Sequence, residues 1–234
     1  MRTTSPSQTE ETGVPNNFTL LTTAVVLVAE QHNPAVINPD FLRNRGIVPK
    51  EWEPHMLDSV SIPLHAQVAY KNGVAIVVTP NHCLFEQRVN GTPGNSHHVH
   101  EYARRYAEKL EYNYIAVGLN WQLQSAHAHP EKWIKNRFFL PGWRKTMRPS
   151  TIAFSIPVPG KNFAVCNFTL RIQQMRSQQG EIAESVLLLG CNIHCALRSG
   201  ARRTRQISNI LKDWKDYQSF LSKAVTEYFE EDLA

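Results

Sequence analysis

Hydrophobic and polar positions alternate in several stretches of the chain, and the C-terminal stretch has helical spacing instead. From Ile207 to Phe229 large apolar residues recur every three or four positions with charged residues between them, which predicts one long amphipathic helix. The apolar run at 182–197 precedes it and predicts a long strand. Because a helix with one apolar stripe needs a surface to cover that stripe, we expect the helix that begins at Arg205 to pack on a sheet.

Apolar runs separated by turn residues predict the remaining elements. The turn signals are clearest at Asn72-Gly73 and Pro159-Gly160, each of which lies between two apolar runs and predicts a hairpin. The other expected elements are strands at 18–30, 62–70, 74–79, 83–89, 114–123, 151–158 and 163–173, a second main helix from Asn95 or Ser96 to Leu110 or Glu111, and a short helix after Asn38.

The order strand, long connection, hairpin, strand, helix occurs twice, in residues 17–112 and again in residues 113–234. No residue-level identity accompanies this order, so only the plan is duplicated. We predict an α+β fold, a mostly antiparallel sheet of about eight strands with two main helices packed on one face. Residues 17–234 are expected to form a single domain behind a flexible N-terminal tail at 1–16 that has little to bury.

Composition is that of an ordinary globular protein, with a basic excess confined to two segments. Only 19% of the 234 residues are charged, and the net charge is +5. Residues 131–148 hold six cations and one carboxylate, and residues 198–205 hold four arginines and no acid. The four cysteines lie in apolar runs, as expected of free thiols in a reducing compartment. Because neither a signal peptide nor a membrane-spanning run is recognised, we expect a cytoplasmic protein with no membrane partner.

Alternation divides the later strands into an apolar and a polar face. At 114–123 it assigns Ile115 and Trp121 to the apolar face and Tyr114 to the polar face. The polar groove candidates are Asn120, Asn167, Arg171, Asn192 and His194, with Gln122 and Thr169 beside them and glycines at 118 and 190 that would allow close approach of a ligand. A solvated face of an antiparallel sheet would carry the same residue types, and that interpretation stays open.

The ten histidines and four cysteines raise the question of a metal site. On a strand Cys191 and Cys195 are about 13 Å apart and His194 points to the opposite face, so these three cannot share one zinc ion. His97 and Glu101 are one helical turn apart but lack the spacing of a zinc-protease helix. We recognise no metal site, cofactor motif, phosphate loop or catalytic residue, which disfavours an enzyme without deciding the question.

The two basic segments carry the clearest signal for an anionic partner. In residues 132–145 cations alternate with aromatic residues, a combination that binds phosphates and stacks bases. The arginines at 198–205 fall at an expected helix start, where they oppose the helix dipole. The alternative is a solvated loop whose aromatic residues are packing anchors. The candidates for anion or partner binding are Lys132, Lys135, Arg137, Arg144, Lys145, Arg202, Arg203 and Arg205.

Three functional hypotheses follow from these patterns. The leading one is a non-enzymatic binding or assembly protein that presents basic loops and a helix-backed sheet to a macromolecular partner, expected to be a protein. The second is a nucleic-acid-binding protein that uses segments 132–148 and 198–205. The third is an enzyme or small-ligand protein that uses the polar face, with His194 as the acid–base group and Arg171 as an anion clamp. The sequence does not indicate an oligomeric state.

Overall fold

The computed structural model describes residues 18–89, 98–127, 129–146, 148–176, 182–200 and 202–229. The expected tail at 1–16 and the expected helix start at Asn95 or Ser96 lie outside the described residues, as does His97. The described residues form nine strands, five α-helices and two short 3₁₀ helices. No helix among them is long and apolar enough to cross a membrane.

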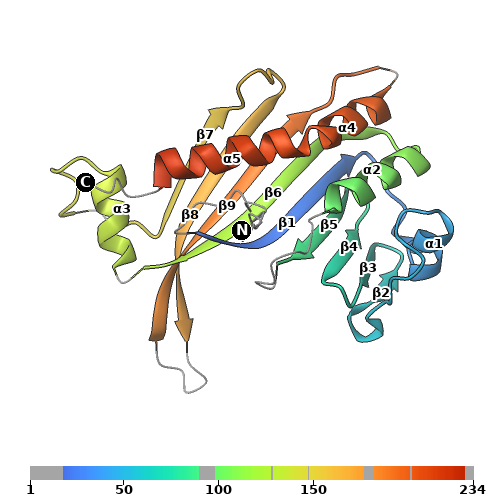
Figure 1. Ribbon diagram of the computed structural model, residues 1–234, viewed down its shortest axis with the longest axis horizontal. Coiled ribbons are helices and arrows are strands. Elements are labelled where there is room, and N and C mark those ends of the chain that lie inside the picture. The colour runs from blue at the N-terminus through green and yellow to red at the C-terminus, as the bar shows by residue number, and fades with distance from the viewer. Residues whose placement is uncertain are drawn as a thin grey trace, which may run out of the picture.

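All nine strands belong to one antiparallel sheet in the order β2-β3-β4-β5-β1-β6-β9-β8-β7 (Figure 1). The strands are β1 (Thr19–Ala29), β2 (Val60–Ile62), β3 (His65–Ala69), β4 (Val74–Val78), β5 (His82–Arg88), β6 (Tyr114–Ala126), β7 (Thr151–Pro157), β8 (Ala164–Arg176) and β9 (Ile182–Ala196). The helices are α1 (Pro39–Asn44), α2 (Val99–Lys109), α3 (Pro130–Phe138), α4 (Arg203–Lys212) and α5 (Trp214–Phe229), with 3₁₀ helices η1 (Pro34–Val36) and η2 (Met56–Asp58).

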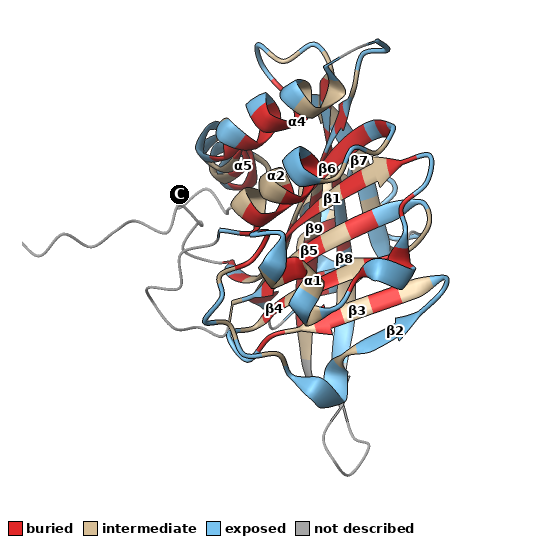
Figure 2. Cartoon of the chain, turned by 90° about the vertical axis from the view of Figure 1, so that its right-hand side faces the viewer, coloured by how far each residue is buried: buried red, intermediate tan, exposed pale blue. Residues whose placement is uncertain are grey.

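The predicted α+β fold is confirmed, and the strand order is the same in both halves of the sheet. β1 and β6 pair at the centre, β5 and β9 lie on their outer sides, and the hairpins β3–β4 and β7–β8 lie further out. The sheet has one strand more than expected. This strand, β2, lies mostly in the long connection between the predicted strands at 18–30 and 62–70, and its three residues are all exposed at the sheet edge (Figure 2).

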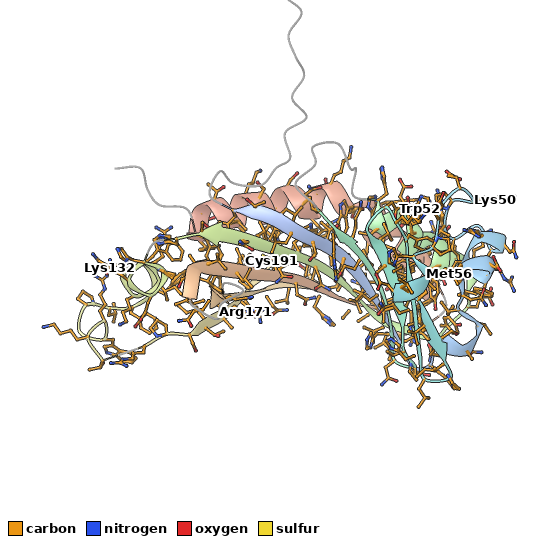
Figure 3. The ribbon with its side chains drawn as sticks, turned by 90° about the horizontal axis from the view of Figure 1, so that it is seen from below. Lys50, Trp52, Met56, Lys132, Arg171 and Cys191 are labelled. Atoms are coloured by element: carbon orange, nitrogen blue, oxygen red, sulfur yellow. The ribbon has the colours of Figure 1, made fainter. Side chains whose placement is uncertain are left out.

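Helices α2, α4 and α5 cover one face of the sheet because their apolar stripes meet the apolar face of the strands. Trp214 of α5 packs on Trp121 of β6 with ring centroids 4.9 Å apart, and Phe229 packs on Phe168 of β8 at 5.6 Å. Figure 3 shows α5 on one side of a curved sheet whose two ends bend toward the other side. The face without these helices is therefore concave, and we call it the open face.

Short-range signals in the sequence predicted the turns and the first helix. The Asn38 side chain accepts a hydrogen bond from the Phe41 N–H at 2.8 Å and caps α1, which Pro39 begins. Gly73 and Gly160, in the two predicted hairpins, have φ values of +83° and +70°, a conformation that glycine adopts without steric cost.

Three details differ from the sequence predictions. The closing helix is interrupted at Asp213, whose carboxylate binds Lys161 in the β7–β8 turn, so it forms α4 and α5. The predicted connection at 124–150 contains α3. Finally, Tyr114 is buried and Ile115 is 46% exposed, the reverse of the expected assignment, because a register shift between β1 and β6 reverses the alternation at this point.

Candidate functional site

Antiparallel register places four polar side chains of the open face in one row across four strands. Asn120 of β6 is paired with Asn192 of β9, which is paired with Asn167 of β8, and Asn167 is opposite Ser155 of β7. We call these four residues the amide row. Since side chains directly opposite each other on one face are about 5 Å apart, neighbours in the row are within hydrogen-bonding reach.

The hydrogen bonds of the amide row run in one direction. The Ser155 hydroxyl donates to Asn167 Oδ1 at 2.7 Å, Asn167 Nδ2 donates to Asn192 Oδ1 at 3.4 Å, and Asn192 Nδ2 donates to Asn120 Oδ1. The Asn120 Nδ2 group at the end has no acceptor in the part of the chain that the structure describes. Each amide thus fixes the orientation of the next, and one donor remains for a ligand.

A hollow of about 380 Å³ extends over the amide row on the open face, and we call it the sheet hollow. Three of the row's residues and Arg171 contribute to its lining. The other polar residues that line it are Thr22, Glu86, Gln122 and Thr169. Glu86, on β5, was not among the sequence candidates, because only the strand order shows that β5 lies across β1 from the amide row.

The sheet hollow carries opposite charges on its two sides. Arg171 lies on β8 and Glu86 on β5, four strand spacings away. The row of Glu86 meets β8 at Asn167, four residues from Arg171, so the two positions are roughly 23 Å apart along the sheet. Arg171 is exposed and makes no ion pair or side-chain hydrogen bond with any described residue. Glu86 has a long contact of 3.8 Å with Arg88. The lining therefore has one charge of each sign on opposite sides and is close to neutral in total charge, and Ala24, Leu84 and Leu188 add apolar surface between its polar groups.

His194 does not line the sheet hollow. It is exposed and pairs in register with Gly118 and Val165. Arg171 is opposite Leu188 on β9, six residues from His194, which separates the two candidates by about 20 Å. The structure therefore does not bring the hypothesised acid–base group and anion clamp to one small substrate.

The cysteine thiols are not available for chemistry in the sheet hollow, although Cys191 contributes to its lining. All four are buried free thiols, and burial raises the pKa of Cys166 to about 12 and that of Cys195 to about 11. Such thiols are protonated at neutral pH and are poor nucleophiles. In the described ranges no three His, Cys, Asp or Glu side chains are placed to hold a metal ion.

Three cations of the first basic segment have structural partners. Arg137 donates to the Glu227 and Tyr228 carbonyl oxygens, at 3.0 and 3.1 Å, and so caps the end of α5. Arg144 donates to the Asn136 and Phe139 carbonyl oxygens at the end of α3. Lys135 pairs with Glu131 at 2.8 Å. Lys132 and Lys145 are exposed and make no hydrogen bond or ion pair with described residues.

The aromatic residues of the same segment mostly anchor α3. Phe138 packs against Phe229 and against Trp133, with centroids 5.9 Å apart in both pairs. Trp143 is 58% exposed. Most of these rings therefore serve in packing, and this arrangement offers little surface on which bases could stack.

The arginines of the second basic segment have two different roles. Arg203 donates to Asn113 Oδ1 and, at 2.9 Å, to the Tyr114 carbonyl oxygen, and so fixes the start of α4 to β6. Arg198, Arg202 and Arg205 line a separate hollow of about 600 Å³ between β9 and α4. The side chains of these three arginines make no ion pair or hydrogen bond with described residues.

Lys132, Lys135 and Arg144 line a further, open hollow of about 1020 Å³ beside α3. Together the fold and these hollows define an α+β protein with a helix-covered face and an open polar face. No protein-family model matches the chain, and no curated protein matches it. The functional argument therefore depends on the geometry of this chain alone.

Proposed function

We propose that this chain is a non-enzymatic binding protein that holds an extended segment of a partner protein in the sheet hollow. The observation that carries the proposal is the hollow itself, a concave polar site on the face that α2, α4 and α5 leave open. Its amide and hydroxyl groups match the donors and acceptors of a peptide backbone. Helices of the same chain cover the opposite face of the sheet and form the hydrophobic core with it. The open face is therefore left for a partner.

The charges of the lining support a protein partner rather than a nucleic acid. One arginine and one glutamate give no excess of positive charge, whereas phosphate binding requires several cations. Base stacking needs exposed aromatic rings, and Trp121, the aromatic residue in the described lining, packs its ring against Trp214 on the helix side. A matching peptide would carry an acid and a base separated by about seven extended residues, which spans the roughly 23 Å between Arg171 and Glu86.

The test is selection from a phage-displayed library of random twelve-residue peptides, followed by measurement of Kd with synthetic copies of the selected peptides. Gly190→Leu places a side chain in the sheet hollow. A Cβ at Gly190 would meet its nearest neighbour, the Thr169 carbonyl oxygen, at 3.7 Å, so the backbone tolerates the change. Ala153→Leu is the matched control, because Ala153 lies in the same row of the open face, two strands away and outside the lining.

We expect selected peptides to bind the wild-type protein and Ala153→Leu with equal affinity and Gly190→Leu at least about tenfold more weakly. Peptides whose acidic residue faces Arg171 should bind a charge-reversal variant at this position more weakly than they bind the wild-type protein. The proposal is wrong if no peptide is enriched, or if the peptides bind all three proteins equally.

A further inference from the structure

We propose that a second site, independent of the proposed function, binds a compact ligand that carries phosphate groups. The site is the hollow of about 600 Å³ between the end of β9 and α4, which we call the arginine pocket. This volume lies in the range of small-ligand sites. Its polar lining consists of Arg198, Arg202, Arg205, Gln206, Asn209 and Asp213.

The charge of the arginine pocket is not compensated by the protein. Its one described carboxylate, Asp213, is bound to Lys161 at 2.5 Å, and the three arginines have no described partner. Three guanidinium groups that face one hollow repel each other, so an anion between them would remove an unfavourable interaction. Because the planar fork of arginine matches the oxygens of phosphate, a phosphate group is the anion that this set suits best.

The backbone that carries the arginines is fixed before any ligand binds. The Arg198 N–H donates to Gln206 Oε1 at 2.9 Å, and Gln206 Nε2 donates to the Arg198 carbonyl oxygen at 3.3 Å, which fixes the end of β9 to α4. Arg205 and Asn209 are one turn apart on α4 and share one face of the helix, and Arg202 is the left-handed residue that directly precedes the helix. The backbone of the site is therefore preformed, and ligand binding has to order only the arginine side chains.

A compact ligand fits the charge distribution better than a polymer does. The unpaired lysines Lys132 and Lys145 are in and after α3, which lies at the far end of α5 from the arginine pocket (Figure 1). The α4–α5 rod between them is about 40 Å long. Its exposed surface carries both signs, with Lys215 beside Asp216, so no continuous positive track joins the two regions.

The lining also offers a surface for the uncharged part of such a ligand. Phe163, Ala196 and Ile210 complete the arginine pocket on its apolar side. A nucleotide could therefore place its phosphates among the arginines and its base or sugar against this side. Inorganic pyrophosphate would use the arginines alone.

The test is isothermal titration calorimetry at near-physiological salt, with inorganic pyrophosphate and ATP as probes. The variant is Arg202→Gly combined with Arg205→Ala, in which glycine suits the positive φ of residue 202. The matched control is Lys132→Ala combined with Lys145→Ala, which removes the same charge at the other end of the molecule. A single-stranded twenty-nucleotide DNA is the third probe.

We expect both small probes to bind the wild-type protein and the control equally, and the pocket variant at least about tenfold more weakly. ATP should bind more tightly than pyrophosphate if the apolar side is used. The proposal is overturned if neither small probe binds the wild-type protein, or if the control loses as much affinity as the pocket variant. The proposal is also overturned if DNA binds more tightly than ATP and if the pocket variant and the control weaken DNA binding equally. Thermal melting checks folding, and Arg198→Gln alone replaces the double variant if that variant unfolds.

Discussion

The buried histidine His32 should make the stability of this protein depend on pH. It is only 2% exposed, in a cluster with Tyr106, Tyr112 and Tyr114. The Leu27 carbonyl oxygen lies 3.2 Å from Nε2 and can only accept, so Nε2 carries the proton and Nδ1 accepts from the Tyr106 hydroxyl at 3.3 Å. The pKa of His32 is lowered to about 4, chiefly by desolvation; the Leu27 hydrogen bond opposes this shift and the nearby His82 adds to it.

The sign of the pH dependence follows from the protonation of His32 in the folded and unfolded states. Between pH 6.5 and pH 4 the unfolded chain binds the proton and the folded chain does not, so protonation favours unfolding as the pH falls. A pKa that drops from 6.5 to about 4 is worth about 2 kcal/mol of lost stability by pH 5 and about 3 kcal/mol by pH 4. Above pH 6.5 this contribution is constant.

Urea denaturation of wild type and His32→Gln, at intervals from pH 7.5 to pH 4.5, measures the effect. Glutamine stays neutral throughout, so the difference between the two curves removes the background from carboxylates that titrate in both proteins. We expect the wild-type protein to lose about 2 kcal/mol more than the variant between pH 7.5 and pH 5. His194→Gln, at an exposed position, should follow the wild-type curve. Identical slopes for wild type and His32→Gln would refute the reasoning.

Three further predictions concern named side chains. Arg202 has a φ of +92°, so Arg202→Gly should be about 1 kcal/mol more stable than Arg202→Ala, a difference of about 2–4 °C in Tm, and equal melting would contradict the strain argument. Arg137→Ala should lose about 1–3 kcal/mol by urea denaturation because two carbonyl oxygens at the end of α5 lose their donor, while Lys132→Ala should change stability by less than about 0.5 kcal/mol. The four buried thiols should react with Ellman's reagent at pH 8 only after unfolding, and rapid labelling of the native protein would disprove their burial.

The layers of this fold could be predicted because the spacing of apolar residues in each strand and helix indicates which of its faces is buried. Leu119, Trp121 and Leu123 alternate with polar residues, and their burial under the helices follows from that period alone. Tyr114 shows the limit of the method. A single register shift between β1 and β6 exchanges the faces, and no local property of residues 114 and 115 signals it.

The candidate sites depend on contacts between residues far apart in the chain, which is why the sequence predicted them only in part. Asn120, Asn192 and Asn167 could be assigned to one face, but their alignment in one row requires the register of three strands. Arg137 was predicted to bind an anionic partner because cations and aromatic residues alternate around it in the sequence. Its partners are carbonyl oxygens 90 and 91 residues away, and charge patterning cannot show them.

The amide row and the arginine pocket both contain arrangements that stability alone does not favour. Asparagine has a low strand propensity, and a hydrogen bond between partly solvated amides contributes only about 1 kcal/mol, so β-branched residues would build an equally stable sheet. Arginines at a helix N-terminus oppose the dipole, and Arg202 is also in a strained conformation. The two surfaces differ in net charge, so their binding should respond differently to salt: phosphate binding to the arginine pocket should weaken steeply, and peptide binding to the near-neutral sheet hollow, with one ion pair at each end, should weaken less. Because binding at the two sites differs in its dependence on salt concentration, a salt titration of both ligands on the same protein can show that the two sites are distinct.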